Sequence, residues 1–204
     1  MTASDMLSDK DFKKCAGFHG HICPGLAIGY RAAMAGLDWL KENRSMDEEL
    51  IAIVETDSCS VDAIQVLTGC TFGKGNFIFK DHGKHVFTLF CRQTGTGVRL
   101  ALKDGAIDLD DRHRELMQKI QAGDALAVEQ EEFKTLHRNK TLSLLKKPID
   151  AMFTIEPVQR FFPEKARIET SIPCDKCGEP TMCTRVVEKN GRRLCLDCAE
   201  GVKR

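Results

Sequence analysis

Residues 50–67 read LIAIVETDSCSVDAIQVL and predict a strand that passes directly into a helix. The first five residues form an apolar run of strand length, and a polar turn follows at residues 56–58. After Cys59, apolar residues recur at a mixed spacing that fits a buried helix. We therefore expect Cys59 to lie between a strand and the start of a helix.

A longer helix is predicted earlier in the chain, at about residues 26–40. Its apolar residues recur at helical spacing, and the pair Pro24-Gly25 suits a first helical turn. Cys23 precedes this helix as Cys59 precedes the other one. The sequence therefore allows the two thiols to face one another.

The remaining segments add strands and a helical layer. Residues 77–79 and 86–90 predict a β-hairpin around the turn at residues 81–84, and residues 94–97 break it before a strand at 98–102. Residues 109–147 predict two amphipathic helices that break at Gly123, and residues 153–158 predict a last strand. A linker at residues 161–173 follows, so we expect domains at 1–165 and 166–204.

Composition disfavours several classes of function. Thirty basic residues balance thirty acidic ones, so no overall field favours nucleic acid or a membrane surface. No apolar run approaches the roughly 20 residues of a spanning helix, and the N-terminal residues are polar where a signal peptide is hydrophobic. Ten cysteines without an export signal indicate thiolate ligands or reduced thiols, a usage that would also suit a strict anaerobe. We therefore expect a cytoplasmic protein.

The C-terminal region carries the strongest motif in the chain. Four cysteines follow the spacing C-x2-C-x17-C-x2-C, which is typical of zinc sites: Cys174, Cys177, Cys195 and Cys198. Each two-residue gap lets both sulfurs of a pair turn to one point about 2.3 Å from the zinc. With a hairpin turn at Asn190-Gly191 and a short helix after the second pair, the pattern predicts a treble-clef or ribbon-type finger. Four filled positions leave none for substrate, so we expect structural Zn²⁺ in a module that docks to a partner.

A second group of candidate ligands lies near the N-terminus. His19, His21 and Cys23 fall within five positions on a loop that contains glycine. The N-terminus of the next helix is expected to lower the pKa of the Cys23 thiol. With Cys59 and Asp62, these residues form a mixed set that suits Zn²⁺ or Fe²⁺, and we treat all five as catalytic candidates.

The roles within this set are less defined. Cys59 and His21 are the first choices as ligands of the second metal. His19, Cys23 and Asp62 are further ligands, orienting groups or proton carriers, and the sequence does not rank them. The alternative is that the histidines bond locally and the thiols are small buried apolar groups.

Basic residues suggest a place for a small anion. Lys74 and Gly75 belong to a Gly-Lys-Gly segment that can present N–H groups and an ammonium to an anion. Lys80, Lys84 and Arg92 alternate along the expected hairpin, where they either add positive charge beside the same cleft or face solvent. A carboxylate, a formyl group or a one-carbon carrier would fit such a cleft.

Two long runs carry a resemblance to a known family. Residues 18–30, FHGHICPGLAIGY, and residues 55–76, ETDSCSVDAIQVLTGCTFGKGN, resemble the FmdE family, which is named after a component of formylmethanofuran dehydrogenase. The resemblance covers most of residues 10–158 and implies an α+β main domain with a mixed sheet flanked by helices. It also implies a metal-binding active site drawn from the Cys and His positions, and many family members carry a C-terminal zinc finger. Family members of this size commonly pair, so a homodimer is expected.

The motif matches fall on the candidates named above. His19, His21 and Cys23 match the first family signature, and Cys59 and Asp62 match the second. Lys74 and Gly75 match a Gly-Lys-Gly-Asn element, and the three other basic residues fall at matching positions.

Two functions of different classes remain open. In the first, the chain is an accessory component of molybdenum or tungsten dehydrogenase-type one-carbon metabolism, and its site handles a metal and a small anionic ligand. In the second, it is a non-catalytic protein that senses or delivers metal, and the finger contacts protein or nucleic acid. The chain has no C-x2-C-x2-C iron–sulfur spacing, so it is not expected to be the dehydrogenase by itself.

Overall fold

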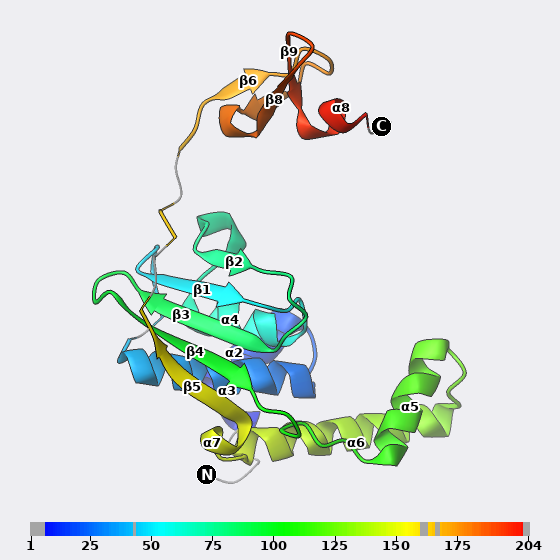
Figure 1. Ribbon diagram of the computed structural model, residues 1–204. Helices are drawn as coiled ribbons and strands as arrows, with labels where there is room; N and C mark the ends of the chain where they lie inside the picture. Colours follow the sequence, from blue (N-terminus) through cyan, green and yellow to red (C-terminus); the bar gives the residue numbers. More distant parts are fainter. Residues whose placement is uncertain (1–6, 43, 160–162, 166–167, 202–204) are drawn as a thin grey trace. The chain divides into compact units, whose positions relative to one another are not determined.

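The computed structural model describes residues 7–42, 44–159, 163–165 and 168–201 (Figure 1). The chain divides into two compact units, residues 1–165 and 166–204. The first unit contains a five-stranded sheet and most of the helices, and the second contains two small two-stranded sheets.

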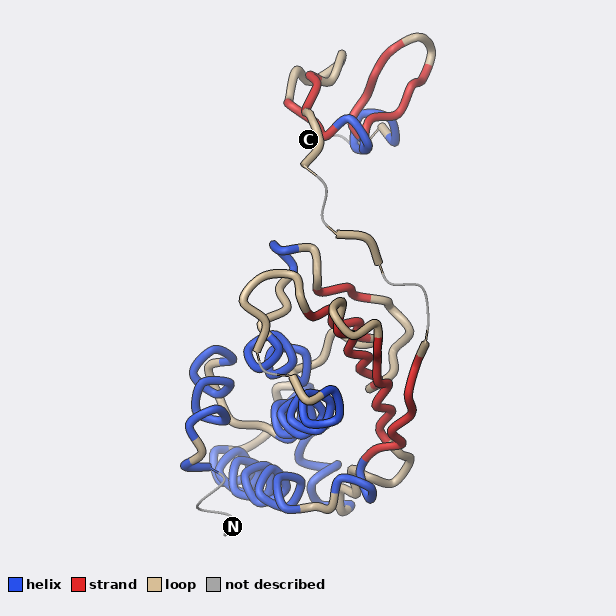
Figure 2. Tube along the Cα trace, turned by 90° about the vertical axis from the view of Figure 1, so that its left-hand side faces the viewer, coloured by secondary structure: helices blue, strands red, loops and turns tan. Residues whose placement is uncertain are grey.

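The five-stranded sheet is mixed and has the order β2-β1-β3-β4-β5. Its strands are β1 (Leu50–Val54), β2 (Phe77–Phe79), β3 (Val86–Cys91), β4 (Thr96–Leu102) and β5 (Phe153–Val158). β1 and β2 run parallel, and the other neighbours are antiparallel. The long helices of this unit lie together on one side of the sheet (Figure 2). The expected α+β architecture with a mixed sheet and helices is therefore confirmed.

The predicted hairpin between residues 77–79 and 86–90 is wrong, because β1 lies between these two segments. β1 pairs Ala52 with Phe77 of β2 on one edge and with Leu89 of β3 on the other. The loop between β2 and β3 crosses the end of β1, where the N–H groups of Lys80 and Lys84 donate to the carbonyls of Val54 and Glu55. β1 is almost entirely apolar and buried, so an inner position hides both its faces and both its edges.

The actual hairpin joins β3 to β4. The segment at residues 92–95 turns the chain, and Gly95 takes a left-handed conformation with φ of 68°. Its N–H donates to the carbonyl of Cys91. The glycine therefore closes a hairpin here, whereas the sequence pattern was interpreted as a break between strands.

Three helices pack together against the sheet: α2 (Lys10–His19), α3 (Pro24–Leu40) and α4 (Ser60–Thr68). α3 and α4 are the two helices predicted from their apolar spacing. α2 was not predicted, although Asp9 caps it by accepting from the N–H groups of Asp11 and Phe12. Phe12 and Cys15 place its apolar face in the core.

Two glycines allow α3 to approach α4 at backbone distance. A Cβ atom on Gly29 would lie 1.9 Å from the carbonyl oxygen of Ser60, and one on Gly25 would lie 3.0 Å from the Cβ of Cys59. Any side chain at Gly29 would therefore force the two helices apart. This contact sets the separation between the start of α3 and the start of α4.

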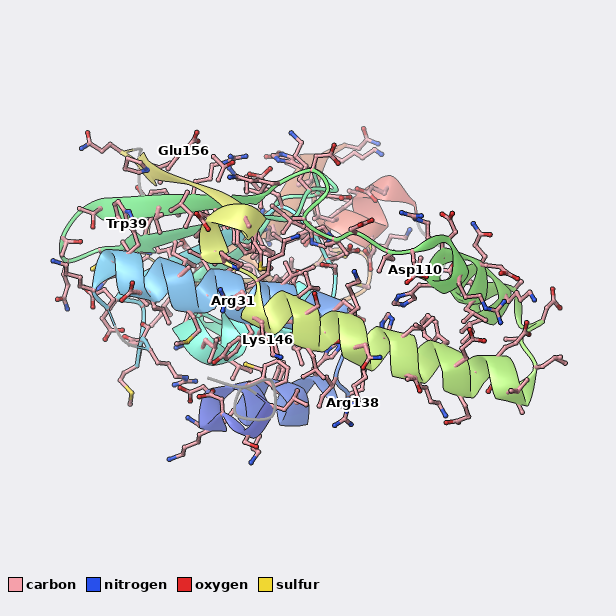
Figure 3. The ribbon with its side chains drawn as sticks, turned by 90° about the horizontal axis from the view of Figure 1, so that it is seen from below. Arg31, Trp39, Asp110, Arg138, Lys146 and Glu156 are labelled. Carbon is pink, nitrogen blue, oxygen red and sulfur yellow. The ribbon has the colours of Figure 1, made fainter. Side chains whose placement is uncertain are left out.

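The helical layer consists of α5 (Asp111–Ala122), α6 (Ala127–Lys146) and the short α7 (Ile149–Met152). The predicted break at Gly123 is confirmed, since this residue ends α5 with φ of 79°. Arg31 of α3 reaches the C-terminal end of α6, near Lys146, and donates to the carbonyls of Leu145 and Lys147 (Figure 3). A guanidinium at this end satisfies carbonyls that have no partner within the helix.

The C-terminal unit is built from short elements. They are β6 (Ser171–Pro173), β7 (Pro180–Met182), η2 (Cys183–Arg185), β8 (Val186–Lys189), β9 (Arg192–Cys195) and α8 (Leu196–Glu200). The predicted hairpin is confirmed as β8 and β9, with Asn190 and Gly191 both at positive φ. β6 falls inside the expected linker and pairs with β7, so the ordered unit begins before Pro173. Phe161 and Phe162 of the expected linker, and Lys203, lie outside the described residues.

None of the helices within the described ranges is long and apolar enough to cross a membrane.

Replacing Gly29 with alanine is expected to destabilise the main unit by about 1–3 kcal/mol or more, because its Cβ would overlap the Ser60 carbonyl. The matched control is Gly17→Ala in α2, where a Cβ would meet nothing within 4 Å and should stabilise the helix by about 0.5–1 kcal/mol. Chemical denaturation of the two variants measures both changes. Equal stabilities would contradict the close contact between α3 and α4.

A pair of histidines joins α5 to α6. The Nε2 of His113 and the Nδ1 of His137 lie 3.0 Å apart, and the ring of Phe133 packs on His137 at a centroid distance of 4.6 Å. Burial lowers the pKa of both histidines, and the nearby His113 and His21 lower that of His137 further. Asp110 opposes the shift at His113, and Lys140 adds to it.

The histidine pair should make the protein sensitive to acid. Both folded-state pKa values lie below the unfolded value, so the unfolded chain binds more protons and stability falls as pH drops through about 6.5. We expect the double variant His113→Asn, His137→Asn to lose less stability than the wild type between pH 7.5 and 5.5. Unfolding midpoints at the two pH values test this, and an equal loss in both proteins would contradict it.

Candidate metal centre and adjoining pocket

Four candidate ligands converge where three helices begin or end. His19 is the last residue of α2, Cys23 precedes α3 and Cys59 precedes α4, while His21 lies on the loop between α2 and α3. The side chains of all four offer ligand atoms within 4.8 Å of one another. The structure therefore brings together the two thiols and the two imidazoles that the sequence singled out.

Asp62 orients one of these imidazoles. Its Oδ2 lies 2.7 Å from the Nδ1 of His19, and the two side chains are 33% and 10% exposed. Because an ionised carboxylate only accepts hydrogen bonds, Nδ1 carries the proton and Nε2 keeps its lone pair. This Nε2 lies 3.7 Å from the Sγ of Cys23. A carboxylate that fixes a histidine in this way is a common companion of a metal ligand.

The spacing of these atoms fits a tetrahedral metal. Bonds of about 2.3 Å to a tetrahedral centre place neighbouring ligand atoms about 3.7 Å apart. Cys23 and His19 are separated by that distance. The donor set of two thiols and two imidazoles is one that zinc and iron accept.

Electrostatics at Cys23 differ from the sequence-based expectation. Burial raises the pKa of its thiol to about 11, and the neighbouring Cys59 adds to the increase. The N–H of Leu26 donates to the sulfur at 3.3 Å and opposes the shift, but burial outweighs it. The prediction that the helix N-terminus lowers this pKa is therefore wrong. A bound cation would supply the charge that a thiolate needs here.

A pocket of about 310 Å³ adjoins the cluster. It lies where β1 and β2 end and α4 begins, and its lining includes three of the residues discussed above, His19, Cys59 and Asp62. The other lining residues are Val54, Thr56, Asp57, Ser58, Val61, Phe77 and Phe79. A molecule in this pocket would touch the candidate metal ligands.

Several of these residues were not predicted as site residues. Ser58 lines the pocket, and its hydroxyl lies 2.7 Å from that of Ser60 and 3.4 Å from the Nδ1 of His85. Phe77 and Phe79 reach the pocket because β2 runs parallel to β1, which places the C-terminal ends of both strands at one edge. The hairpin predicted from the sequence would have put β2 elsewhere, so this signal was missed.

The predicted anion-binding residues are not gathered at this pocket. Lys74 donates to the carbonyls of Met46 and Asp47, and Gly75 ends a short 3-10 turn at φ of 70°. Arg92 donates to the carbonyls of Glu48, Pro163 and Glu164. Lys80 and Lys84 lie exposed on the loop between β2 and β3. Among the described residues, no lysine or arginine lines the pocket beside the cluster.

The four C-terminal cysteines form the second cluster. The sulfurs of Cys174, Cys177, Cys195 and Cys198 lie within 4.8 Å of one another, and those of Cys177 and Cys195 are 3.9 Å apart. Backbone N–H groups of Cys177, Cys195 and Lys176 lower the pKa of Cys174 to about 6. The fifth thiol, Cys183, points instead to the carboxylate of Glu169 at 3.7 Å. The geometry fits a closed tetrahedral zinc site with Cys183 outside it.

Sequence families agree with both clusters. The family described as "FmdE, Molybdenum formylmethanofuran dehydrogenase operon" matches residues 18–154. The chain belongs to the FmdE family. Its C-terminal unit matches the prokaryotic DksA/TraR C4-type zinc finger over residues 167–204, which together with the four sulfurs indicates a structural zinc. The resemblance found in the sequence is thus confirmed for the FmdE domain and for the finger.

Individual relatives give further context. A protein of Archaeoglobus fulgidus, described as a "Probable S-adenosyl-L-methionine-binding protein", is 33% identical over 193 residues. The match covers 89% of this chain and 50% of the relative, so this FmdE protein spans about half the relative's length. A crystal structure of an FmdE-like protein of tungsten formylmethanofuran dehydrogenase, from Syntrophus aciditrophicus, superposes with a TM-score of 0.62. That match covers 99% of this chain and 94% of the other at 24% identity, so it supports the fold alone.

Asp62→Ala is expected to lower the affinity of the FmdE domain for Zn²⁺ or Fe²⁺ by about 10–100-fold, because His19 loses the group that orients it. Asp62→Asn keeps an acceptor and should lose less. Asp57→Asn is the control, since Asp57 lines the same pocket and is not a predicted partner of His19. Competition with a chromophoric chelator measures the affinities, and unchanged binding in Asp62→Ala would contradict the orienting role.

Proposed function

We propose that this FmdE protein is an accessory component of molybdenum or tungsten formylmethanofuran dehydrogenase-type one-carbon redox metabolism, with a metal-dependent site for a small ligand in its main domain. The observation that supports this proposal is the convergence of four donor atoms within 4.8 Å beside a pocket of about 310 Å³. Ligand pockets in proteins begin at about this size. The family description supports the metabolic setting.

Three donors would form the fixed part of this centre. His19, Cys23 and Cys59 are at least partly buried, whereas His21 is exposed on its loop. We assign His21 as the ligand that exchanges with water or substrate, because an exposed loop residue can leave without disturbing the helices. Three fixed protein ligands and one exchangeable position are the usual arrangement of a catalytic zinc.

The role of an accessory component follows from what the sequence lacks. An enzyme that moves electrons to a one-carbon unit needs a redox cofactor, and no iron–sulfur cysteine run is present in the chain. The name of the A. fulgidus relative supports binding of a small organic molecule rather than electron transfer. A single metal centre beside a small pocket suits binding or activation of such a molecule.

The finger is assigned to docking. Its cysteines fill a closed zinc site, so the unit offers its surface rather than its metal. Apolar side chains remain exposed on this small unit, namely Met182, Val187 and Leu196. Apolar groups exposed together mark contact surfaces, and a dehydrogenase component or another protein is the proposed partner. Balanced charge over the whole chain argues against nucleic acid.

A metal-sensing or metal-delivery protein is the second candidate. The observation that favours it is the complete set of four donors, which can close a tetrahedron and leave no position for substrate. A homodimer and a cytoplasmic location stay predictions under either candidate.

Metal analysis of the anaerobically purified chain tests the proposal. We expect two metals per chain, one lost in Cys59→Ser and the other lost in Cys177→Ser. Cys183→Ser is the matched control and should keep both, because this thiol lies outside the C-terminal cluster. His21→Ala should keep both metals but bind the main-domain metal more weakly.

Two results would overturn this assignment. A wild-type chain with one metal that Cys59→Ser retains would remove the main-domain centre. Complete loss of that metal in His21→Ala would show that His21 is a fixed ligand, which would favour the sensing or delivery candidate.

A further inference from the structure

The pocket beside the metal cluster has two kinds of wall. One wall is apolar and consists of Val54, Val61, Phe77 and Phe79. Phe79 ends β2 and keeps 45% of its surface exposed, so a large aromatic surface remains open to a bound molecule. Aromatic rings offer a negative face to flat apolar groups and to cations.

The other wall carries negative charge. Asp57 and Asp62 line the pocket, Asp57 exposed on the loop and Asp62 in the first turn of α4. Asp62 remains a carboxylate while it accepts from the Nδ1–H of His19. No lysine or arginine within the described ranges contributes to the lining. The polar side of the pocket is therefore anionic.

A bound metal would not reverse this sign. In the proposed centre a divalent ion is matched by two thiolates, those of Cys23 and Cys59, and the histidines are neutral ligands. The two aspartates then leave the pocket negative in total. A second negative ligand would meet repulsion from Asp57 and Asp62.

The basic residues around the site do not offset these carboxylates. Lys80 and Lys84 lie outside the lining, on the loop that also carries His82, and His82 lies 2.9 Å from the carboxylate of Glu55. Lys74 and Arg92 are bonded to backbone carbonyls elsewhere. The charge that an anion would need is therefore not at the pocket.

We propose that this pocket binds a small organic cation with a flat apolar face, such as an arylalkylammonium, in preference to an anion. The cation lies beside Asp57 and Asp62, and its flat face packs on Phe79. This inference rests on the proposed ligand site and names its ligand class, which differs from the small anion expected from the sequence. A volume of about 310 Å³ limits the bound group to a compact one.

Three probes of similar size test the charge preference: benzylamine, which is protonated at pH 7, benzyl alcohol and benzoate. Each is titrated into the full-length, metal-analysed protein by calorimetry at low ionic strength. We expect benzylammonium to bind at least about tenfold more tightly than benzoate, with benzyl alcohol between them. The advantage of the cation should shrink as salt is added.

Two variants locate the effect. Asp57→Asn should weaken benzylammonium about two- to fivefold and leave benzyl alcohol unchanged, because it removes a charge and little volume. Phe79→Leu should weaken both of these probes, since it removes the aromatic surface. Asp124→Asn, between α5 and α6, is the control that removes a carboxylate outside the pocket lining.

The outcomes separate this inference from the proposed function. Benzoate binding as tightly as benzylammonium, no binding of any probe, or an unchanged affinity in Asp57→Asn would overturn the cation preference. If the protein lacks the main-domain metal but still prefers benzylammonium, the metal-dependent function fails and the ligand class stands. If the metal is present and the preference is absent, the reverse holds.

Discussion

The contact between α3 and α4 is the constraint on which the main-domain site depends. Gly29 lies against the Ser60 carbonyl, and Gly25 lies against the Cβ of Cys59. Backbone packed on backbone leaves no side chain that can move aside, so the distance between the two helix starts is fixed. Cys23 and Cys59 occupy those two starts and are brought into reach of the same ion.

The two metal clusters stabilise their thiolates by different means. In the finger, backbone N–H groups lower the pKa of Cys174, so the site favours a thiolate before the zinc arrives. In the main domain, burial raises the pKa of Cys23, and the charge must come from the metal itself. The finger is thus prepared for a permanent ion. The main-domain centre depends more strongly on its ion and keeps an exposed histidine at its edge.

Function is concentrated where the main-domain cluster meets the pocket. Membership of the FmdE family establishes the kind of domain, and the geometry adds a site with an oriented histidine, two thiols and an adjoining cavity. The anion-binding residues expected from the sequence lie elsewhere, several of them bonded to carbonyls that hold loops in place. The carboxylates and aromatic rings of the pocket point to a different ligand from the one that the basic residues suggested.

The sequence by itself determined the features that depend on local spacing. The zinc motif needs only two short turns and a hairpin, and both fall on residues close together in the chain. The long helices follow from apolar periodicity, and Gly123 marks a break because it can adopt positive φ. The His/Cys cluster was visible because three of its four donors lie within five positions.

Only the tertiary structure decided what lies beside that cluster. Apolar alternation marks residues 77–79 as a strand but does not state which neighbour it pairs with, and its position beside β1 brings Phe77 and Phe79 to the pocket. The pKa of Cys23 likewise depends on burial by distant segments, which outweighs the local helix N-terminus. Strand pairing and burial are long-range properties, whereas ligand spacing and helix periodicity are written within a few residues.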